Sequence, residues 1–522
     1  MKLNRTQNAG RNMIFGGILK IYDLLVPFIM RTVMLYFLGV QYLGLSNLFS
    51  SILQVLNLAE LGVGSAMVYS MYKPIAENDT DKICALMKLY KVYYRIIGIV
   101  IAVLGVLLLP FIPKLIEGDI PNDINVYVLY LINLSATVLS YWLFAYKNSI
   151  IQAHQRADIG SKVSICTSTL QYLIQLFAII VLKNYYVYII TMLATQALTN
   201  VVTAIVVDKL YPNYKAKGNL DKRIVYDINR KIKDLFTSKF SYVIVSSSDS
   251  VVISAFLGLT ILAVYQNYYF LMQAISSLLY IIFSSCMAGI GNSLIVESKK
   301  KNLNDLKKFT FIISWIAGFC TCCFACLYQP FITIWVGEEY LLDYSIVICL
   351  CIYFFVSQIN QLLNTYKDAA GIWHEDRFRP IITALTNLIL NVILVNYIGL
   401  YGVILSTVFS IVVIGIPWLL HNLFKLLFDK SQIWNYISKL IGYILVTILS
   451  CFISYILCSF IHVPVIWKIV LNLLVCLIVP NTVFGIIYYK SVELKESIDL
   501  LNSITKGKLV FINKYLNKKS NI

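Results

Sequence analysis

Residues 11–39 read RNMIFGGILKIYDLLVPFIMRTVMLYFLG, an apolar run long enough to cross a membrane that nevertheless contains Lys20, Asp23 and Arg31. At about 100° per residue, the polar and helix-bending positions of this run fall within one arc of roughly 100°, and aliphatic and aromatic residues cover the rest of the helix. Each charge placed in lipid costs at least about 2.5 to 3.5 kcal/mol. The charged arc is therefore predicted to face protein or water.

The composition indicates an all-α polytopic membrane protein. Of its 522 residues, 59% are hydrophobic and only 13% are charged, whereas soluble domains contain about 25% charged residues. The basic N-terminus precedes an apolar run that is too long for the core of a signal peptide and has no small-residue cleavage site. We therefore expect a retained first span.

Runs of about 20 apolar residues divide the chain into about 14 predicted transmembrane helices. Their approximate ranges are 11–38, 44–72, 84–113, 124–146, 163–182, 185–207, 240–258, 261–296, 309–336, 341–366, 380–396, 399–424, 440–461 and 464–489.

The distribution of basic residues explains the net charge of +17. Most Lys and Arg residues lie in alternate connections, starting with the N-terminal tail, and the intervening connections contain only Lys114, Lys183 and Lys468. The positive-inside rule then places both termini in the cytoplasm. The basic excess reflects topology, and a nucleic-acid partner is not predicted.

Twelve cysteines are present, and Cys320, Cys322, Cys323 and Cys326 cluster in one apolar span. No His or carboxylate lies near them in the sequence, so we interpret them as packing or lipid-facing residues, with no metal site and no disulfide framework.

Two carboxylates in apolar spans are candidate binding or coupling groups. Glu60 precedes a Gly-x-Gly-Ser-Ala run that permits close helix contact, and it either binds a cation or proton or caps a helix near the cytoplasmic end. Asp249 lies near the centre of a span behind three serines, and a membrane core tolerates such a group only when it is paired, protonated or hydrated.

The start of the third span has Lys88, Lys91 and Arg95 interleaved with tyrosines. This pattern is typical of a cytoplasmic rim with snorkelling cations and an aromatic belt, although Arg95 is deep enough for a role facing a cavity. Spans four to six contain uncharged polar residues, including Thr199 and Asn200, which either bond helices together or line a cavity suited to sugars.

The second half repeats a motif of the first. FLGVQYLGL at 37–45 resembles FLGLTILAV at 256–264, and each joins the first two spans of its half. We predict an N-lobe over 1–209, a basic amphipathic cytoplasmic linker over 210–238, a C-lobe over 239–428, two further helices within 429–490 and a basic cytoplasmic tail over 491–522.

Over its first twelve predicted spans, the chain resembles the polysaccharide repeat-unit flippases of the multidrug/oligosaccharidyl-lipid/polysaccharide (MOP) exporter superfamily. The resemblance rests on FLGVQYLGLSNLF with the following LAELGVGSA, on SDSVVISAFLGLTILAVY, and on RPIITALTNLILNVILVNYIGLYGVILSTVFS at 379–410. It implies two six-helix lobes around a central cavity that opens alternately to either side. The two extra C-terminal helices are expected to form a groove for a lipid tail.

The cargo that the resemblance implies is an oligosaccharide on undecaprenyl pyrophosphate, moved to the outer leaflet of the bacterial plasma membrane for capsule or exopolysaccharide synthesis. Polymerase and glycosyltransferases of the same pathway are then expected partners. Our hypothesis is that Arg31, aided by Lys20 and Arg95, attracts the pyrophosphate, and that Asp23 keeps the cluster from binding too tightly. Asp249 and Glu60 would respond to Na⁺ or H⁺, and no other cofactor is expected.

Three rival functions share parts of this pattern. A flippase for lipid-linked peptidoglycan or teichoic acid precursor would need nearly the same contacts with phosphate, sugar and lipid tail. A multidrug cation antiporter would favour acidic and aromatic cavity residues, against which the basic arc of the first helix argues. An integral-membrane polymerase or glycosyltransferase would need a sizeable catalytic loop, and the predicted outer loops are short, so an enzyme is not expected.

Overall fold

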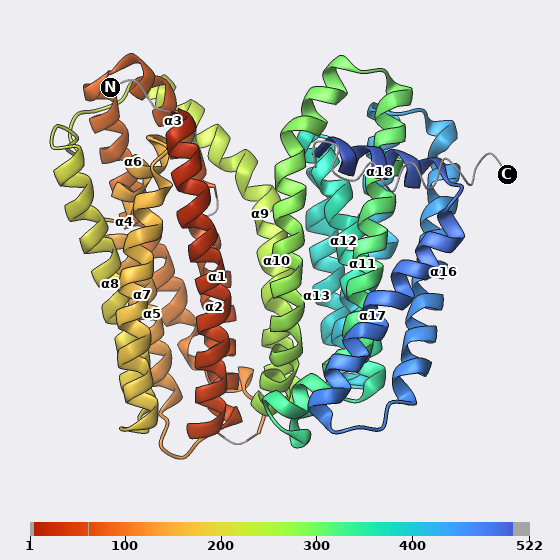
Figure 1. The fold of residues 1–522 in the computed structure, drawn as a ribbon. Coiled ribbons are helices and arrows are strands. Elements are labelled where there is room, and N and C mark those ends of the chain that lie inside the picture. Colours follow the sequence, from red (N-terminus) through yellow and green to blue (C-terminus); the bar gives the residue numbers. More distant parts are fainter. Residues whose placement is uncertain (1–4, 61, 119, 505–522) are drawn as a thin grey trace. The chain divides into compact units, whose positions relative to one another are not determined.

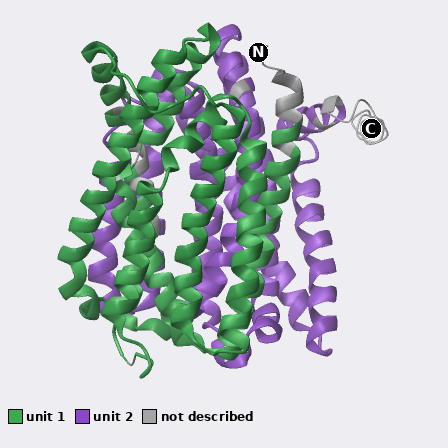
Figure 2. Cartoon of the chain, turned by 90° about the vertical axis from the view of Figure 1, so that its left-hand side faces the viewer, with its two compact units in different colours: residues 1–263 green, residues 264–522 purple. Residues whose placement is uncertain are grey.

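The computed structural model describes residues 5–60, 62–118 and 120–504, which form helices joined by short loops and contain no strand (Figure 1). The chain divides into two compact units, residues 1–263 and 264–522 (Figure 2). The all-α fold predicted from composition is confirmed.

Unit 1 is built around a layer of long helices. Within it α1 packs against α7 and α2, α7 packs against α8, α5 packs against α4 and α8, and α9 packs against α2 and α3. Its helices are α1 (Arg5–Phe37), α2 (Val40–Leu56), η1 (Asn57–Glu60), α3 (Val63–Glu77), α4 (Thr80–Leu108), η2 (Leu109–Leu115), α5 (Val126–Trp142), η3 (Ala145–Lys147), α6 (Asn148–Ala153), α7 (Ala157–Ile180), α8 (Tyr185–Leu210) and α9 (Lys222–Leu257).

Unit 2 is centred on α11, which packs against α12, α16 and α17. The helix α10 (Leu259–Val296) begins in unit 1 and continues into unit 2. The others are α11 (Lys299–Trp335), η4 (Glu338–Tyr340), α12 (Tyr344–Ala369), α13 (Arg379–Ile398), α14 (Leu400–Phe409), η5 (Ser410–Gly415), α15 (Ile416–Leu426), η6 (Lys430–Gln432), α16 (Ile433–Ser459), α17 (Val465–Tyr488) and α18 (Val492–Ile504).

The predicted total of 14 spans is not confirmed. Among the described residues, ten helices are long and apolar enough to cross a membrane, or eleven if the bent pair α5 and α6 is one span. The predicted spans 11–38, 44–72 and 240–258 are not among them. The first contains four charged residues within α1, namely Arg11, Lys20, Asp23 and Arg31. The second is broken between α2 and α3, and the third is only the apolar end of α9, Val243–Leu257.

Residues 222–238 of the predicted linker and residues 240–257 of the predicted seventh span form one continuous helix, α9, and the division between the packed units falls after Ala263. The predicted limits of the lobes stay a prediction. Of the predicted basic tail, the helix α18 is described, and Lys439 of α16 donates a hydrogen bond to Glu493 in it. Residues 505–522 of that tail lie outside the described residues.

The repeated motif occupies equivalent turns. Gly39 joins α1 to α2 with φ 110° and ψ 170°, and Gly258 joins α9 to α10 with φ 89° and ψ 170°. Residues with side chains rarely adopt this backbone conformation, which explains the shared glycine. The two copies also touch, because a Cβ on Gly44 would lie 2.4 Å from the carbonyl oxygen of Leu259.

Candidate functional site

Two interrupted helices meet in unit 1. The path from α2 to α3 is broken by η1, and α5 is followed after two residues by η3 and α6, which bend the pair by 48°. The helices α3 and α6 pack against one another beyond these breaks. At membrane depth, irregular backbone is tolerated where it is buried in protein or lines a cavity, and transporters commonly build their binding sites from such broken helices.

Glu60 lies at the first break and accepts hydrogen bonds from two tyrosines of other helices. Tyr94 of α4 donates to Oε1 at 2.5 Å, and Tyr141 of α5 donates to Oε2 at 2.8 Å. Tyr90 donates in turn to the Tyr94 hydroxyl at 2.6 Å. Glu60 makes no ion pair with any other described residue. Its carboxylate is thus held by hydroxyl groups alone in this part of the chain.

Two glycines after Glu60 make room for the hydroxyl cluster. Gly62 has φ 89°, in the left-handed region where glycine is favoured. A Cβ on Gly64 would lie 3.0 Å from the Tyr90 hydroxyl and 3.7 Å from Glu60 Oε1. The Gly-x-Gly run therefore serves the site, in addition to permitting close packing as the sequence suggested.

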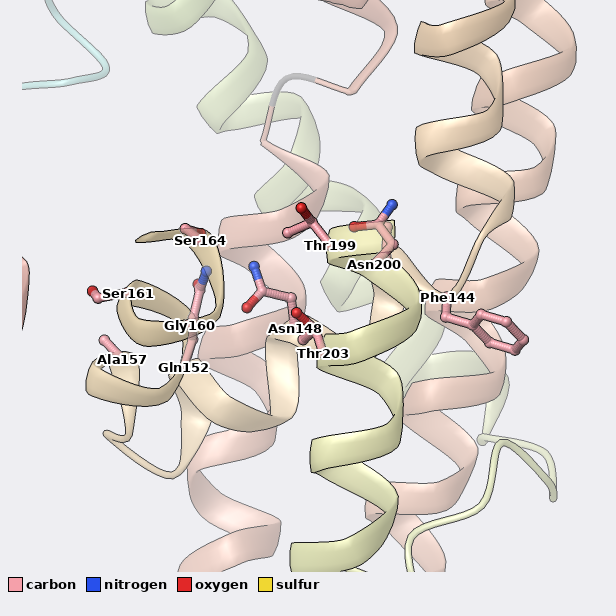
Figure 3. Close-up of a pocket in the computed structure, with 11 residues that line it drawn as sticks. Phe144, Asn148, Gln152, Ala157, Gly160, Ser161, Ser164, Thr199, Asn200 and Thr203 are labelled. Carbon is pink, nitrogen blue, oxygen red and sulfur yellow. The ribbon is translucent and has the colours of Figure 1, made fainter. Parts of the chain in front are cut away.

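A polar cavity adjoins the carboxylate. One void of about 350 Å³ reaches Glu60, Tyr90 and Tyr94, and a second of about 230 Å³ continues between α6, α7 and α8. Four residues line both voids: Ala145, Asn148, Gln152 and Asn200. Figure 3 shows the second void, with Asn148 between residues of α7 and residues of α8.

The wall of the second void is rich in uncharged hydrogen-bonding groups. Its polar members are Asn148, Gln152, Ser161, Ser164, Thr199, Asn200 and Thr203. Asn200 also donates to the Ser140 carbonyl at 2.8 Å, and Thr199 donates to the Thr167 hydroxyl at 2.8 Å. The same residues thus bond helices together and line a polar cavity, and the suitability of this cavity for sugars stays a prediction. Among the described residues that line the two voids, none has a basic side chain.

The predicted charges of the first helix lie on α1, and none of them is among the residues that line this cavity. Lys20 and Asp23 are exposed, and neither makes an ion pair within the described residues. Arg31 is half-buried, and its Nη2 donates to Asn47 Oδ1 of α2 at 3.5 Å. The Nδ2 of Asn47 is buried and has no hydrogen-bond partner in the described part of the chain.

The other two predicted residues lie on separate helices. Arg95 is on α4, exposed beside the exposed side chains of Ile96 and Ile99, and its carbonyl accepts a hydrogen bond from Trp142 at 3.3 Å. Asp249 is 6% exposed on α9, the helix that packs on α2 and α3. Arg95 thus lies on a different helix from Lys20 and Arg31, and the proposed roles of these residues stay predictions.

Sequence reasoning missed the partners of Glu60. The tyrosines around Lys91 were interpreted as a membrane-interface belt, whereas Tyr90 and Tyr94, one helical turn apart, point into the site. The break after α5 gave no signal, since Phe144 rather than glycine adopts φ 57° there. The sequence signal for this site is the spacing of Tyr90 and Tyr94, which places both hydroxyls on one face of α4, together with the isolated carboxylate of Glu60 in a neighbouring apolar run.

A histidine follows α6 in the loop that leads to α7. His154 stacks on Tyr211 with ring centroids 4.4 Å apart, and its buried Nε2 has no hydrogen-bond partner among the described residues. Burial lowers the pKa of His154 to about 4. The ring is therefore neutral at physiological pH and serves as an aromatic packing group.

Each unit also has a buried aspartate at the start of a helix. In unit 1, Asp158 is fully buried and bonds to Arg156 at 2.9 Å. In unit 2, Asp376 pairs with Arg379 at 2.7 Å and accepts from Asn422 at 3.2 Å. These networks fix helix ends, and they leave His374 and Glu375, which lie beside Asp376, exposed.

Comparison with known proteins identifies both a family and a fold. The sequence profile described as "Polysaccharide biosynthesis protein" matches residues 9–288. No curated protein matches the chain.

Solved structures of several membrane transporters match nearly their whole length. The lipid II flippase MurJ in an inward closed conformation has a TM-score of 0.66 at 17% identity, covering 92% of this chain and 99% of MurJ. An inward-facing multidrug resistance MATE family transporter of the MOP superfamily has a TM-score of 0.62 at 14% identity, covering 81% and 99%. A MOP superfamily transporter from Pyrococcus furiosus has a TM-score of 0.51 at 12% identity, covering 82% and 96%. The chain therefore has the fold of this superfamily.

Proposed function

Because its profile matches more than half of the sequence, the chain belongs to the polysaccharide biosynthesis protein family, and we propose that it is a flippase for lipid-linked oligosaccharides. In this proposal it moves repeat units on undecaprenyl pyrophosphate from the cytoplasmic to the outer leaflet of a bacterial plasma membrane by alternating access. Both termini lie in the cytoplasm, the exported glycan serves capsule or exopolysaccharide synthesis, and the protein is a carrier rather than an enzyme.

The observation that supports a sugar cargo is the amide- and hydroxyl-lined cavity of unit 1. Each neutral hydrogen bond contributes about 0.5 to 1.5 kcal/mol net, so several such contacts hold a glycan without trapping it. Asn148, Gln152 and Asn200 line both parts of the cavity and present amides, which can donate and accept. This pattern suits hydroxyl groups of varied geometry better than it suits a hydrophobic drug.

The pyrophosphate is assigned to the first helix. Arg31 is half-buried beside the unpartnered Nδ2 of Asn47, so a charged and a neutral donor lie next to each other. One guanidinium group donates two parallel hydrogen bonds to the oxygens of a phosphate group. In our proposal Arg31 holds the pyrophosphate, and Lys20 and Arg95 attract it.

The coupling ion is assigned to carboxylates. Glu60 is held by two tyrosine hydroxyls and makes no ion pair with a described residue, so a bound Na⁺ or H⁺ would neutralise it. Asp249 is the second candidate because it is buried in α9. Asp23, exposed on α1, moderates the attraction of the neighbouring cations.

The test is export of surface glycan by variants in a deletion strain. Arg31→Ala should abolish surface polysaccharide and leave lipid-linked oligosaccharide on the inner leaflet, and Arg31→Lys should restore part of the export. Arg377→Ala, at an exposed arginine in the loop before α13, is the matched control and should export normally. Full export by Arg31→Ala, at wild-type protein levels, would refute the assignment.

A second candidate function is transport of a lipid-linked cell-wall precursor. The match to the lipid II flippase covers 92% of the chain, whereas the match to the inward-facing multidrug transporter covers 81%. Rescue of a strain that lacks its peptidoglycan or teichoic acid precursor flippase would favour this function. Drug resistance conferred without any glycan phenotype would instead favour a multidrug antiporter.

A further inference from the structure

Three helices of unit 2 bring three thiols together. Cys326 of α11, Cys458 of α16 and Cys476 of α17 have Sγ atoms that all lie within 4.8 Å of one another. The three residues are 6%, 4% and 0% exposed, respectively. They are far apart in the sequence, so the cluster exists only because α11, α16 and α17 pack against each other.

The surroundings of the cluster hold these helices in register. Asn472, one turn before Cys476 on α17, donates to the Cys326 carbonyl at 3.0 Å and is 1% exposed. The thiol of Cys476 donates to the Cys322 carbonyl at 3.6 Å. The Oδ1 of Asn472 is buried with no hydrogen-bond partner among the described residues. Two hydrogen bonds, from Asn472 and from Cys476, therefore fix α17 to α11. The Oδ1 of Asn472 lies buried beside them as a further acceptor.

The chemistry of the cluster selects a soft ion. With metal–sulfur bonds of about 2.3 Å, three sulfurs arranged around one ion lie about 4 Å apart, which agrees with the observed limit of 4.8 Å. Structural zinc sites have four ligands. Here three thiols have Sγ atoms within mutual reach, with no His, Asp or Glu in the group among the described residues, and Cys323 packs beside them as a partly buried neighbour. Cysteine sulfur favours Cu(I) among soft ions.

Cysteine binds a metal ion as the thiolate. Each cysteine that ligates Cu(I) therefore breaks its S–H bond, releases the proton to solvent and forms an S–Cu bond. Copper keeps its oxidation state, so the step needs no oxidant or reductant.

We propose that Cys326, Cys458 and Cys476 form a three-coordinate Cu(I) site that joins α11, α16 and α17. This site is separate from the cavity of unit 1 and does not depend on the transported cargo. Because the ligands come from three helices, the bound ion stabilises the folded form of unit 2 over its unfolded form.

The experiment uses the full-length protein, purified under anaerobic reducing conditions and supplied with Cu(I) together with a competing chelator. Elemental analysis after desalting should find about one copper per wild-type chain, and copper should raise the unfolding temperature. Cys476→Ser should retain less than about a tenth of that copper. X-ray absorption of the loaded wild-type protein should show sulfur ligands only.

The matched controls are Cys166→Ser, at an exposed cysteine on α7, and Cys286→Ser on α10, both outside the cluster; each should bind copper like the wild type. If Cys476→Ser does not fold, Cys458→Ser, one residue from the end of α16, provides the same test. Equal copper retention by a folded cluster variant would overturn the proposal. Nitrogen or oxygen ligation, or retention of zinc but not copper, would also overturn it.

Discussion

Replacing Glu60 by glutamine separates the coupling role of this residue from its structural role. The side chain keeps its size and one acceptor oxygen, loses its charge, and has an NH₂ donor in place of the second acceptor oxygen. Tyr94 and Tyr141, which donate to the two carboxylate oxygens at 2.5 and 2.8 Å, can still bond to the amide, since a hydroxyl both donates and accepts.

The structure sets the size of the two effects. Two hydrogen bonds to a charged group, worth about 1.5 to 3 kcal/mol each, become neutral bonds of about 0.5 to 1.5 kcal/mol, so folding should weaken by only a few kcal/mol. A cation about 4 Å from the carboxylate is attracted by about 4 kcal/mol at an effective dielectric constant of 20. Losing that attraction lowers cation affinity about 1,000-fold.

The assay is the unfolding temperature of the purified protein, measured across a Na⁺ titration at fixed pH and across a pH titration without Na⁺. A coupling ion that binds the folded protein raises the unfolding temperature in the wild type, and Glu60→Gln should abolish the dependence on Na⁺. In the pH titration the variant should lose only the contribution of Glu60, since the slope that His154 gives below about pH 6.5 remains. Export of surface glycan in a deletion strain should fall in parallel.

The control is Glu77→Gln, at an exposed carboxylate near the end of α3. This variant should keep the ion dependence and the export of the wild type. If Glu60→Gln keeps the same ion dependence and the same export as the wild type, Glu60 is not the coupling carboxylate, and its hydrogen bonds serve structure alone.

Two further predictions concern stability. Asp376→Ala removes the buried carboxylate and leaves the Arg379 guanidinium, which is 6% exposed, without its bidentate partner. The variant should lose about 3 to 5 kcal/mol of unfolding free energy, measured by thermal or denaturant unfolding. A loss below about 1 kcal/mol would contradict a stabilising role of this ion pair. His154 stays neutral in the folded protein down to about pH 4, whereas an unfolded histidine binds a proton near pH 6.5, so stability should fall as pH drops from about 6.5 to 4. After discounting for the solvent that still reaches the ring, the loss is about 1 to 2 kcal/mol; His154→Gln should remove this slope, and an unchanged slope would refute the contribution.

Much of the fold could be predicted from the sequence because hydropathy reports it directly. The apolar runs that became α11, α12, α16 and α17 each match a predicted span, since a long uninterrupted helix satisfies its own backbone in lipid. The FLG repeat also located two equivalent turns, because only glycine adopts their backbone conformation readily.

The candidate site was less predictable because it depends on contacts between distant residues. Glu60 was identified from its polarity within an apolar run, but its partners on α4 and α5 are known only once those helices are packed. The thiols of Cys458 and Cys476 are likewise isolated in the sequence. Hydropathy also misses helices that break inside an apolar run, as at Phe144, because composition does not change there.

The contact between the two repeated turns makes the two copies unequal. Position 44 of the first copy aligns with position 263 of the second, and these are Gly44 and Ala263. Gly44 has no room for a methyl group against the carbonyl oxygen of Leu259, whereas Ala263 already has one and is fully buried. The two segments are therefore not interchangeable: the second copy's alanine would clash if it replaced the first copy's glycine.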